Sequence, residues 1–287
     1  MPISQQTHGG VLIVTLDAPA VRNALDRDDM AALRDLFENI AYREPWPPKR
    51  QAGAADGLRP RAVVLRSTGD VFSAGAHLGE MRRLGAADLP TNLSAALDMG
   101  AMFRAVRNCP APVVCRVQGP AYGGGVGLVA ACDLVVAAPA ARFAFSEVRL
   151  GLVPGVIAPL VMERIGVAAA RAVFLTGDTI AADDAHRLGL VDRLADSDAA
   201  LDAAVGAVVT SLLRGGPAAL GQVKSLVDGA QTLGLARSAE FCARAIAEAR
   251  TGAEGQAALA AFNAKQPSPW HEDAAWALPA AGPQEAP

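Results

Sequence analysis

Short apolar strand patterns alternate with helical patterns through the first half of the chain, and this alternation limits the fold more than any other feature. β-Branched runs typical of buried strands occur at 11–16, 61–67, 112–118 and 133–138, and 141–146 alternates like a half-buried strand. Helical spacing covers 25–43 and 91–108, and a further helix starts within 123–132. We therefore predict an α/β core with right-handed crossovers.

The second half of the chain has a different pattern. From about 156 onward helical patterns dominate, 190–194 is the remaining strand pattern, and Ala-rich helical segments run from 198 to 265. We predict an α/β core at 1–197 and, at 198–287, a helical region that mediates oligomerisation and ends in a flexible tail. The Pro-, Gly- and charge-rich segment 44–60 is predicted to be an exposed loop.

Composition excludes several classes of protein. Of 287 residues 52% are hydrophobic, and 26 Lys and Arg against 29 Asp and Glu give a net charge of −3, which does not suit a nucleic-acid-binding surface. No stretch approaches the roughly 18 apolar residues of a membrane span, and the first ten residues do not resemble a signal peptide. We predict a cytoplasmic protein with neither a nucleic-acid nor a membrane partner. Its four Cys and four His are too scattered for a metal site.

Two glycine-containing loops, 71–81 and 117–133, each follow an apolar strand. Glycines let the backbone approach a ligand closely, and a helix start leaves N–H groups unpaired, so two such loops could together form an oxyanion hole. Tight turns are the alternative for each loop alone. Gly125, Gly127 and Ala130 also fit the GxGxxA dinucleotide fingerprint, with Glu147 as the ribose-binding acid, but residues 119–122 separate the strand from the glycines.

Glu147 stands among apolar residues where the strand pattern 141–146 ends. Desolvation there would raise its pKa, as a proton-transfer group working near neutrality requires. A structural ion pair with Arg149 or Arg142 is the alternative, and position alone does not choose between the two.

Several motifs occur together and in a fixed order between about residues 8 and 270. They are LDAPAVRNALD, FSAGAHL, GGGVGLVAACD, ARFAFSEVRLGLVPG with the downstream FLTGDTIAADDAHRLGLVDRL, and the weaker EGQAALAAFNAKQPSPW. In combination they resemble the crotonase family of enoyl-CoA hydratases and isomerases. The resemblance implies a spiral of ββα units, a helical C-terminal region that builds trimers or hexamers, and an acyl-CoA substrate with no separate cofactor.

The resemblance also implies roles for individual residues. The thioester oxygen would be held by the N–H groups of Ala76 and Gly124, and the CoA would run along Ala24, Ala74 and Leu78. Arg22 would lie near the CoA phosphates, although a solvated surface position is the alternative.

One departure from the family pattern bears on whether the chain catalyses hydration or isomerisation. Hydratases of fatty-acid oxidation carry two glutamates, of which only the second, Glu147, is present, because Gly127 occupies the first position. Enoyl-CoA isomerases with a single carboxylate share this pattern. Bacterial methylglutaconyl-CoA hydratases of leucine and isoprenoid breakdown share it too. Two segments of this chain, SEVRLGLVPGVIAP and GGGVGLVAACD, are similar to the signatures of these hydratases.

Two polar residues within the first glycine loop, His77 and Glu80, each have two possible roles. His77 replaces the usual Asp of the family and could act as a base or contact CoA, or it could replace a structural hydrogen-bonding side chain. Glu80 could face the acyl pocket or be a solvated helix residue.

We predict a hydratase that adds water to an α,β-unsaturated acyl-CoA with a branched or carboxylated acyl group, such as a glutaconyl-CoA. Glu147 would protonate the α-carbon and help to position the water. The alternatives are a double-bond isomerase that uses Glu147 alone, a CoA-binding protein without catalysis, and a dinucleotide-dependent dehydrogenase.

Overall fold

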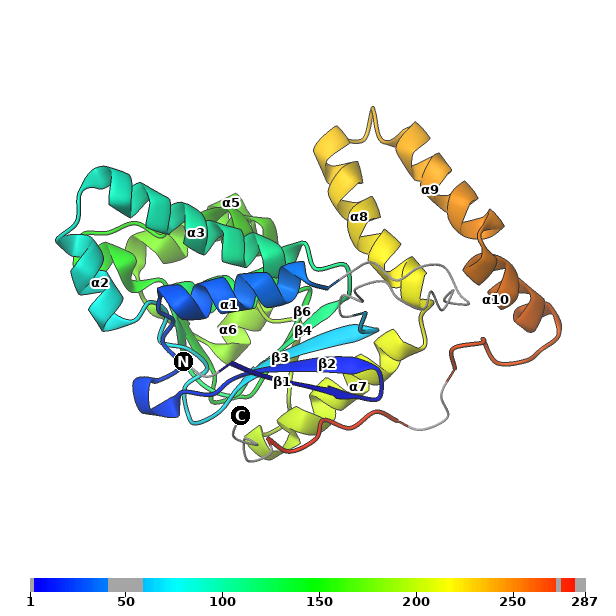
Figure 1. The fold of residues 1–287 in the computed structure, drawn as a ribbon, viewed down its shortest axis with the longest axis horizontal. Coiled ribbons are helices and arrows are strands. Elements are labelled where there is room, and N and C mark those ends of the chain that lie inside the picture. Colours follow the sequence, from blue (N-terminus) through cyan, green and yellow to red (C-terminus); the bar gives the residue numbers. More distant parts are fainter. Residues whose placement is uncertain (1–2, 41–58, 272–274, 282–287) are drawn as a thin grey trace.

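The computed structural model describes residues 3–40, 59–271 and 275–281. Its main sheet has six strands in the order β1-β2-β3-β4-β6-β9 (Figure 1). These strands are β1 (Ile3–His8), β2 (Val11–Leu16), β3 (Ala62–Ser67), β4 (Val113–Val117), β6 (Leu134–Ala137) and β9 (Arg193–Leu194). β1 runs antiparallel to β2, and the remaining pairs are parallel.

Both faces of the sheet are covered, and β2 and β3 are accordingly buried along their whole length. Alternate residues of these strands enter two separate hydrophobic clusters, because successive side chains point to opposite faces. One cluster lies under α1 (Arg27–Glu38), α3 (Leu89–Arg107), α4 (Gly124–Ala131), α5 (Ala158–Thr176) and α6 (Ala182–Leu188). The other lies under α7 (Leu201–Leu213). The predicted α/β class is thus confirmed.

A second, three-stranded sheet connects the segments that carry the predicted functional loops. It contains β5 (Ala121–Tyr122), β7 (Arg142–Ala144) and β8 (Thr179–Ala181), with β7 in the centre. An isolated bridge joins Ser73 to Ala121 and another joins Leu25 to Ala76. The chain segments near residues 25, 75, 122 and 144 therefore lie side by side.

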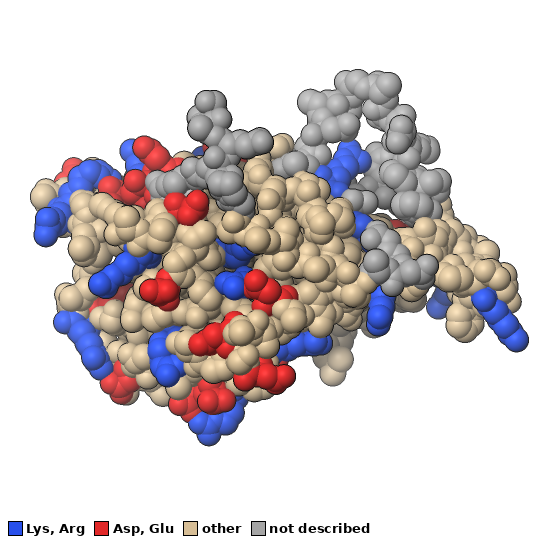
Figure 2. All heavy atoms as spheres, turned by 90° about the horizontal axis from the view of Figure 1, so that it is seen from below, with Lys and Arg blue, Asp and Glu red and all other residues tan. Residues whose placement is uncertain are grey.

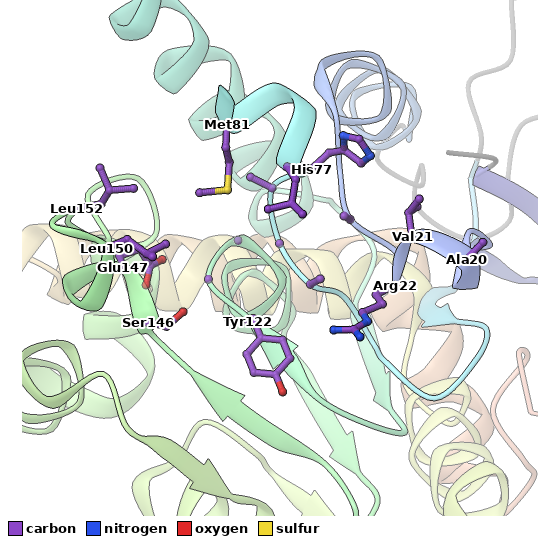
Figure 3. Close-up of a pocket in the computed structure, with 17 residues that line it drawn as sticks. Ala20, Val21, Arg22, His77, Met81, Tyr122, Ser146, Glu147, Leu150 and Leu152 are labelled. Atoms are coloured by element: carbon purple, nitrogen blue, oxygen red, sulfur yellow. The ribbon is translucent and has the colours of Figure 1, made fainter. Parts of the chain in front are cut away.

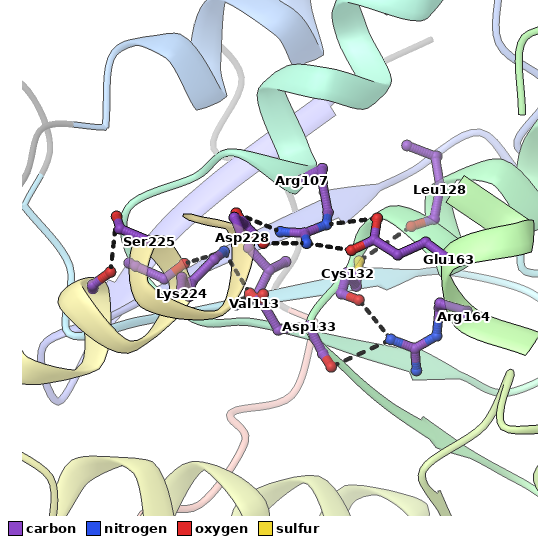
Figure 4. A network of polar contacts seen from close by, with 12 residues as sticks. Arg107, Val113, Leu128, Cys132, Asp133, Glu163, Arg164, Lys224, Ser225 and Asp228 are labelled. Atoms are coloured by element: carbon purple, nitrogen blue, oxygen red, sulfur yellow. Dashed lines mark hydrogen bonds and ion pairs between the residues drawn. The ribbon is translucent and has the colours of Figure 1, made fainter. Parts of the chain in front are cut away.

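The last helices project from the body of the molecule (Figure 1). They are α8 (Pro217–Leu233), α9 (Ala239–Thr251) and α10 (Ala253–Asn263). An ion-pair network fixes α8 to the core: Arg107 binds Asp228 at 2.7 Å, and Lys224 binds Asp133 at 2.6 Å (Figure 4). The helix α7, which follows the predicted boundary at 198, packs on the core sheet instead.

The described part of the predicted C-terminal tail, residues 275–281, is held against the core. The Trp276 side chain belongs to the cluster under α7, and its indole N–H donates to the carbonyl oxygen of His8 at 3.0 Å. Arg66 donates to the carbonyl oxygen of Pro279 at 2.7 Å. Most of the predicted loop 44–60 and the rest of the tail lie outside the described residues.

Surface charge follows the near balance of the composition. On the face drawn in Figure 2, acidic and basic side chains are interspersed over the body of the molecule. Within the described ranges, no single helix has the length and hydropathy needed to cross a membrane. One pair, 198–213 with 217–233, passes that test jointly but is bent by 97°.

Candidate active site

One cavity of about 760 Å³ collects all eight predicted site residues (Figure 3). They share its wall with the side chains or backbones of Ala20, Val21, Gly75, Met81, Tyr122, Gly123, Ser146, Leu150 and Leu152. Three of these residues are marked in the sequence by their position next to a predicted site residue or glycine run. Tyr122 directly precedes the glycine run, Ser146 directly precedes Glu147, and Met81 lies one helical turn after Leu78.

The first glycine loop presents the N–H group of Ala76 to this cavity. Leu25 donates to the Gly75 carbonyl oxygen at 2.8 Å, and the Leu25 carbonyl oxygen accepts from His77 at 2.8 Å. The residues on both sides of Ala76 are thus paired with Leu25, whereas the Ala76 N–H has no acceptor among the described residues. Gly75 makes the loop possible, because its φ of 82° is accessible to glycine at little cost.

The second glycine loop presents the N–H group of Gly124. Gly123, with a φ of 47°, caps α4 and donates to the Ala144 carbonyl oxygen at 3.0 Å. Gly124 is the first residue of α4, so its N–H has no acceptor within the helix and lies at the positive end of the helix dipole.

The two loops are close enough for both N–H groups to face one ligand atom. A Cβ atom placed on Gly75 would lie 3.1 Å from the nitrogen of Gly124, and one placed on Gly124 would lie 4.0 Å from the nitrogen of Ala76. Ser73 holds this spacing: its hydroxyl donates to the Asn23 carbonyl oxygen at 2.8 Å, and its carbonyl oxygen accepts from Tyr122 at 3.0 Å. Two converging donors of this kind can stabilise negative charge on an oxygen.

Glu147 faces the same loops from the short 3-10 helix η2 (Ser146–Leu150). A Cβ atom on Gly123 would lie 3.2 Å from its Oε1. Its Oε2 is buried and has no hydrogen-bond partner in the described part of the chain. Burial raises the pKa of the Glu147 carboxyl, against a weaker opposing effect of a hydrogen bond from its own backbone N–H.

The structural alternative for Glu147, an ion pair, is not formed. Arg149 pairs with Asp178, and Arg142 donates to the carbonyl oxygens of Pro139 and Ala141. A half-buried carboxyl group whose buried Oε2 has no partner among the described residues, beside two N–H groups that face the same cavity, is the arrangement expected of a proton-transfer group rather than of a structural ion pair.

Comparison with known proteins shows the family. The family model for enoyl-CoA hydratase/isomerase matches residues 6–273. The chain belongs to this enoyl-CoA hydratase/isomerase family. A Thermus thermophilus protein provisionally named an enoyl-CoA hydratase is 32% identical over 263 residues, covering 92% of this chain and 98% of its own. The enoyl-CoA isomerase/hydratase of Mycosarcoma maydis is 30% identical, covering 92% of this chain and 94% of its own.

Solved structures of enoyl-CoA hydratases share the fold. The enzyme from Mycobacterium smegmatis superimposes with a TM-score of 0.83 at 30% identity, over 94% of this chain and 99% of its own. The predicted crotonase fold with its helical C-terminal region is therefore confirmed, and the protein is an enzyme of the enoyl-CoA hydratase/isomerase family. The roles predicted for individual site residues remain predictions.

The dinucleotide fingerprint has a structural explanation instead. A Cβ atom on Gly125 would lie 2.5 Å from the Ser73 carbonyl oxygen, so this glycine is needed for close packing of the two loops. Gly125 and Gly127 are both buried, and so is Ala130. None of the three lines the cavity.

Gly127, where family hydratases carry their first glutamate, is closed by its neighbours. A Cβ atom there would lie 2.4 Å from Cγ2 of Ile157 and 2.8 Å from Cζ of Phe103. The volume beyond Gly127 is thus filled by apolar side chains, which leaves no room for a carboxylate at the position of the family's first glutamate.

We expect Gly127→Glu to lower the free energy of unfolding by about 1–3 kcal/mol or more, because it overpacks this site and buries a carboxylate. Urea denaturation followed by circular dichroism measures the change. Gly85→Glu is the matched control, since a Cβ atom at Gly85, the last residue of α2 (Leu78–Gly85), meets nothing within 4 Å. A Gly127→Glu protein as stable as the wild type would contradict this description of the site.

His77 has the structural role that the sequence left open. It is the N-cap of α2, and its Nδ1 accepts from the Gly79 N–H at 3.2 Å. It therefore takes over the capping function that an Asp side chain serves well, while its ring lies at the cavity wall. Glu80 pairs with Arg83 and does not line the cavity.

The described residues contain no group of three or more His, Cys, Asp or Glu side chains that could hold a metal ion.

Proposed function

We propose that this enzyme adds water to an α,β-unsaturated acyl-CoA with a branched or carboxylated acyl group. The observation that carries the proposal is the buried Oε2 of Glu147, which has no hydrogen-bond partner among the described residues and lies beside the loops that present the Ala76 and Gly124 N–H groups. No separate cofactor is required for this reaction, since coenzyme A is part of the substrate.

The two N–H groups stabilise the charge that develops during addition. When water attacks the β-carbon, the electrons of the double bond move toward the thioester oxygen, which becomes negative. Hydrogen bonds from Ala76 and Gly124 to that oxygen would each contribute about 3 kcal/mol to transition-state stabilisation.

A single carboxyl group can balance the protons of hydration. In this mechanism Glu147 starts protonated, gives its proton to the α-carbon, and receives on its other oxygen a proton from the attacking water. The carboxylic acid is thereby regenerated, and H and OH have added across the double bond. Burial favours the neutral acid that this cycle requires, because it raises the pKa of Glu147.

The cavity wall supports a branched acyl group more strongly than a carboxylated one. In Figure 3 Met81, Leu150 and Leu152 lie on the side of Glu147, whereas Arg22 lies on the opposite side of the glycine loop. The acyl group would therefore meet apolar side chains, and Arg22 would lie toward the CoA moiety, where its charge suits a phosphate.

Double-bond isomerisation is the second candidate. The packing of Ile157 and Phe103 against Gly127 favours it, because a carboxylate that could help Glu147 to hold water has no space there. In that reaction Glu147 would act as a carboxylate that moves one proton between carbons.

The pH dependence of turnover is expected to separate the two reactions. Hydration with protonated Glu147 should slow as pH rises through the raised pKa of this group, whereas isomerisation with ionised Glu147 should slow as pH falls through it. We expect the first profile for kcat/KM. The opposite limb would indicate an isomerase.

A panel of CoA thioesters tests the proposed function. Crotonyl-CoA, methylcrotonyl-CoA and methylglutaconyl-CoA would be incubated with the enzyme and followed by product mass and by absorbance of the conjugated double bond. We expect gain of one water with loss of absorbance, fastest for a branched ester. An absorbance change at constant mass would indicate an isomerase, and no change with any ester would indicate a CoA-binding protein without catalysis.

We also propose that the protein is a cytoplasmic homo-oligomer, either a trimer or a hexamer. Large apolar side chains on the projecting helices are exposed, notably Val227 at 57%, Ile246 at 55% and Phe262 at 78%. Such a surface is typical of a subunit interface. Light scattering of the purified protein would give the mass of the assembly.

A further inference from the structure

Phe103 and Ile157 fill the space at Gly127, so the cavity offers the attacking water one carboxyl group, that of Glu147, where family hydratases provide two. Water has two O–H groups, and its lone pair must point at the β-carbon for addition. If only Glu147 accepts one of these O–H groups, the water can still rotate about that hydrogen bond. A hydratase built this way needs a second polar group on the same side of the cavity.

Ser146 occupies the place that such a group requires. It directly precedes Glu147 in η2, lines the cavity and is half-buried. Figure 3 shows the side chains of Ser146 and Glu147 on the same side of the cavity. No hydrogen bond to this hydroxyl occurs within the part of the chain that the structure describes, and Oε2 of its neighbour Glu147 is likewise unpartnered.

The other polar side chains of the cavity are less suited to this task. The Nδ1 atom of His77 accepts from the Gly79 N–H at 3.2 Å, and in Figure 3 the ring of His77 is turned away from Glu147. The hydroxyl of Tyr122 points away from Glu147 in Figure 3, and Arg22 lies across the glycine loop from it.

We propose that Ser146 is the second water-binding group of this enzyme and replaces part of the role of the missing carboxylate. This inference rests on the proposed hydration. The water donates one O–H to the Glu147 oxygen that will take its proton and the other to Oγ of Ser146, which leaves a lone pair for the β-carbon. Ser146 keeps its own proton throughout, and only Glu147 exchanges protons with substrate and water.

The test compares two reactions of one variant. Hydration needs both the water and the proton-transfer group, whereas exchange of the α-proton of a saturated acyl-CoA in D2O needs only Glu147 and the two N–H groups. In Ser146→Ala we expect hydration to slow by about tenfold, corresponding to loss of one hydrogen bond in the transition state, with α-proton exchange within about twofold of the wild type. Ser211→Ala, which removes an exposed hydroxyl on α7, should leave both rates unchanged.

Unchanged hydration in Ser146→Ala would overturn the inference, and so would an equal loss of hydration and exchange, because Ser146 would then support Glu147 rather than water. Retained exchange also shows that the variant is folded. If the wild-type enzyme does not hydrate any ester, the proposed function itself fails, and that result is seen before the variant is compared.

Discussion

Replacing Glu147 by Gln is expected to lower turnover with an enoyl-CoA substrate by about 10²–10⁴-fold, the usual contribution of a positioned proton-transfer group. Gln keeps the shape of the side chain but cannot give a proton to the α-carbon. Binding should persist, because the Ala76 and Gly124 N–H groups and the rest of the cavity wall are unchanged. Steady-state kinetics together with a thermal shift by a CoA ester measure both effects.

The same variant is expected to gain stability at neutral pH. The folded protein raises the pKa of Glu147 above its ordinary value of 4.5, so burying the ionised group costs free energy that Gln does not incur. This cost exists only at pH values at which Glu147 is ionised in the unfolded chain. The gain in melting temperature of Glu147→Gln over the wild type should therefore vanish as the pH falls below 4.5, the ordinary pKa of the group. Glu240→Gln, at a side chain 89% exposed, is the control that should change neither activity nor stability. Near-normal turnover of Glu147→Gln would remove this residue from the mechanism.

Replacing Gly75 by Ala is expected to lower kcat by about 10²–10³-fold, as loss of an oxyanion donor does. The new methyl carbon would lie 2.7 Å from the Tyr122 carbonyl oxygen and 3.1 Å from the nitrogen of Gly124, so the two donor loops must separate. The φ of 82° adds a conformational cost of roughly 1–3 kcal/mol for any residue with a Cβ atom.

Gly234→Ala separates these two effects. Gly234 has a φ of 69°, but a Cβ atom there meets nothing within 4 Å. This control should show the loss of stability without the loss of kcat. If Gly75→Ala retained kcat while losing as much stability as Gly234→Ala, the two loops would not form the oxyanion hole.

The fold could be predicted where local pattern determines the element. The runs at β2 and β3 are buried on both faces and contain few polar residues, so their strand character is visible in the sequence. The edge strand β1 (ISQQTH) is polar and largely exposed and has no such signal. The strands β5 and β8 are two and three residues long and form only through pairing with distant segments, chiefly β7.

The site could be predicted as a set of residues but not as a set of contacts. Glycines and an isolated acid after strands indicated Gly124 and Glu147, and both line the cavity. Arg149 does not pair with Glu147 because it pairs with Asp178, which lies 29 positions from Arg149 and is not connected to it by any pattern in the sequence. Closure of Gly127 likewise depends on Phe103 and Ile157, which only the packing of α3 and the start of α5 bring together.

Hydration in oxygen-18 water tests the central claim most directly. The enzyme would be incubated with a branched α,β-unsaturated acyl-CoA in labelled water, and the product would be analysed by mass spectrometry beside Glu147→Gln. We expect one labelled oxygen on the β-carbon of the wild-type product and almost none with the variant over the same time. Conversion of the ester without incorporation of label, or equal incorporation by the variant, would contradict a hydratase that works through Glu147.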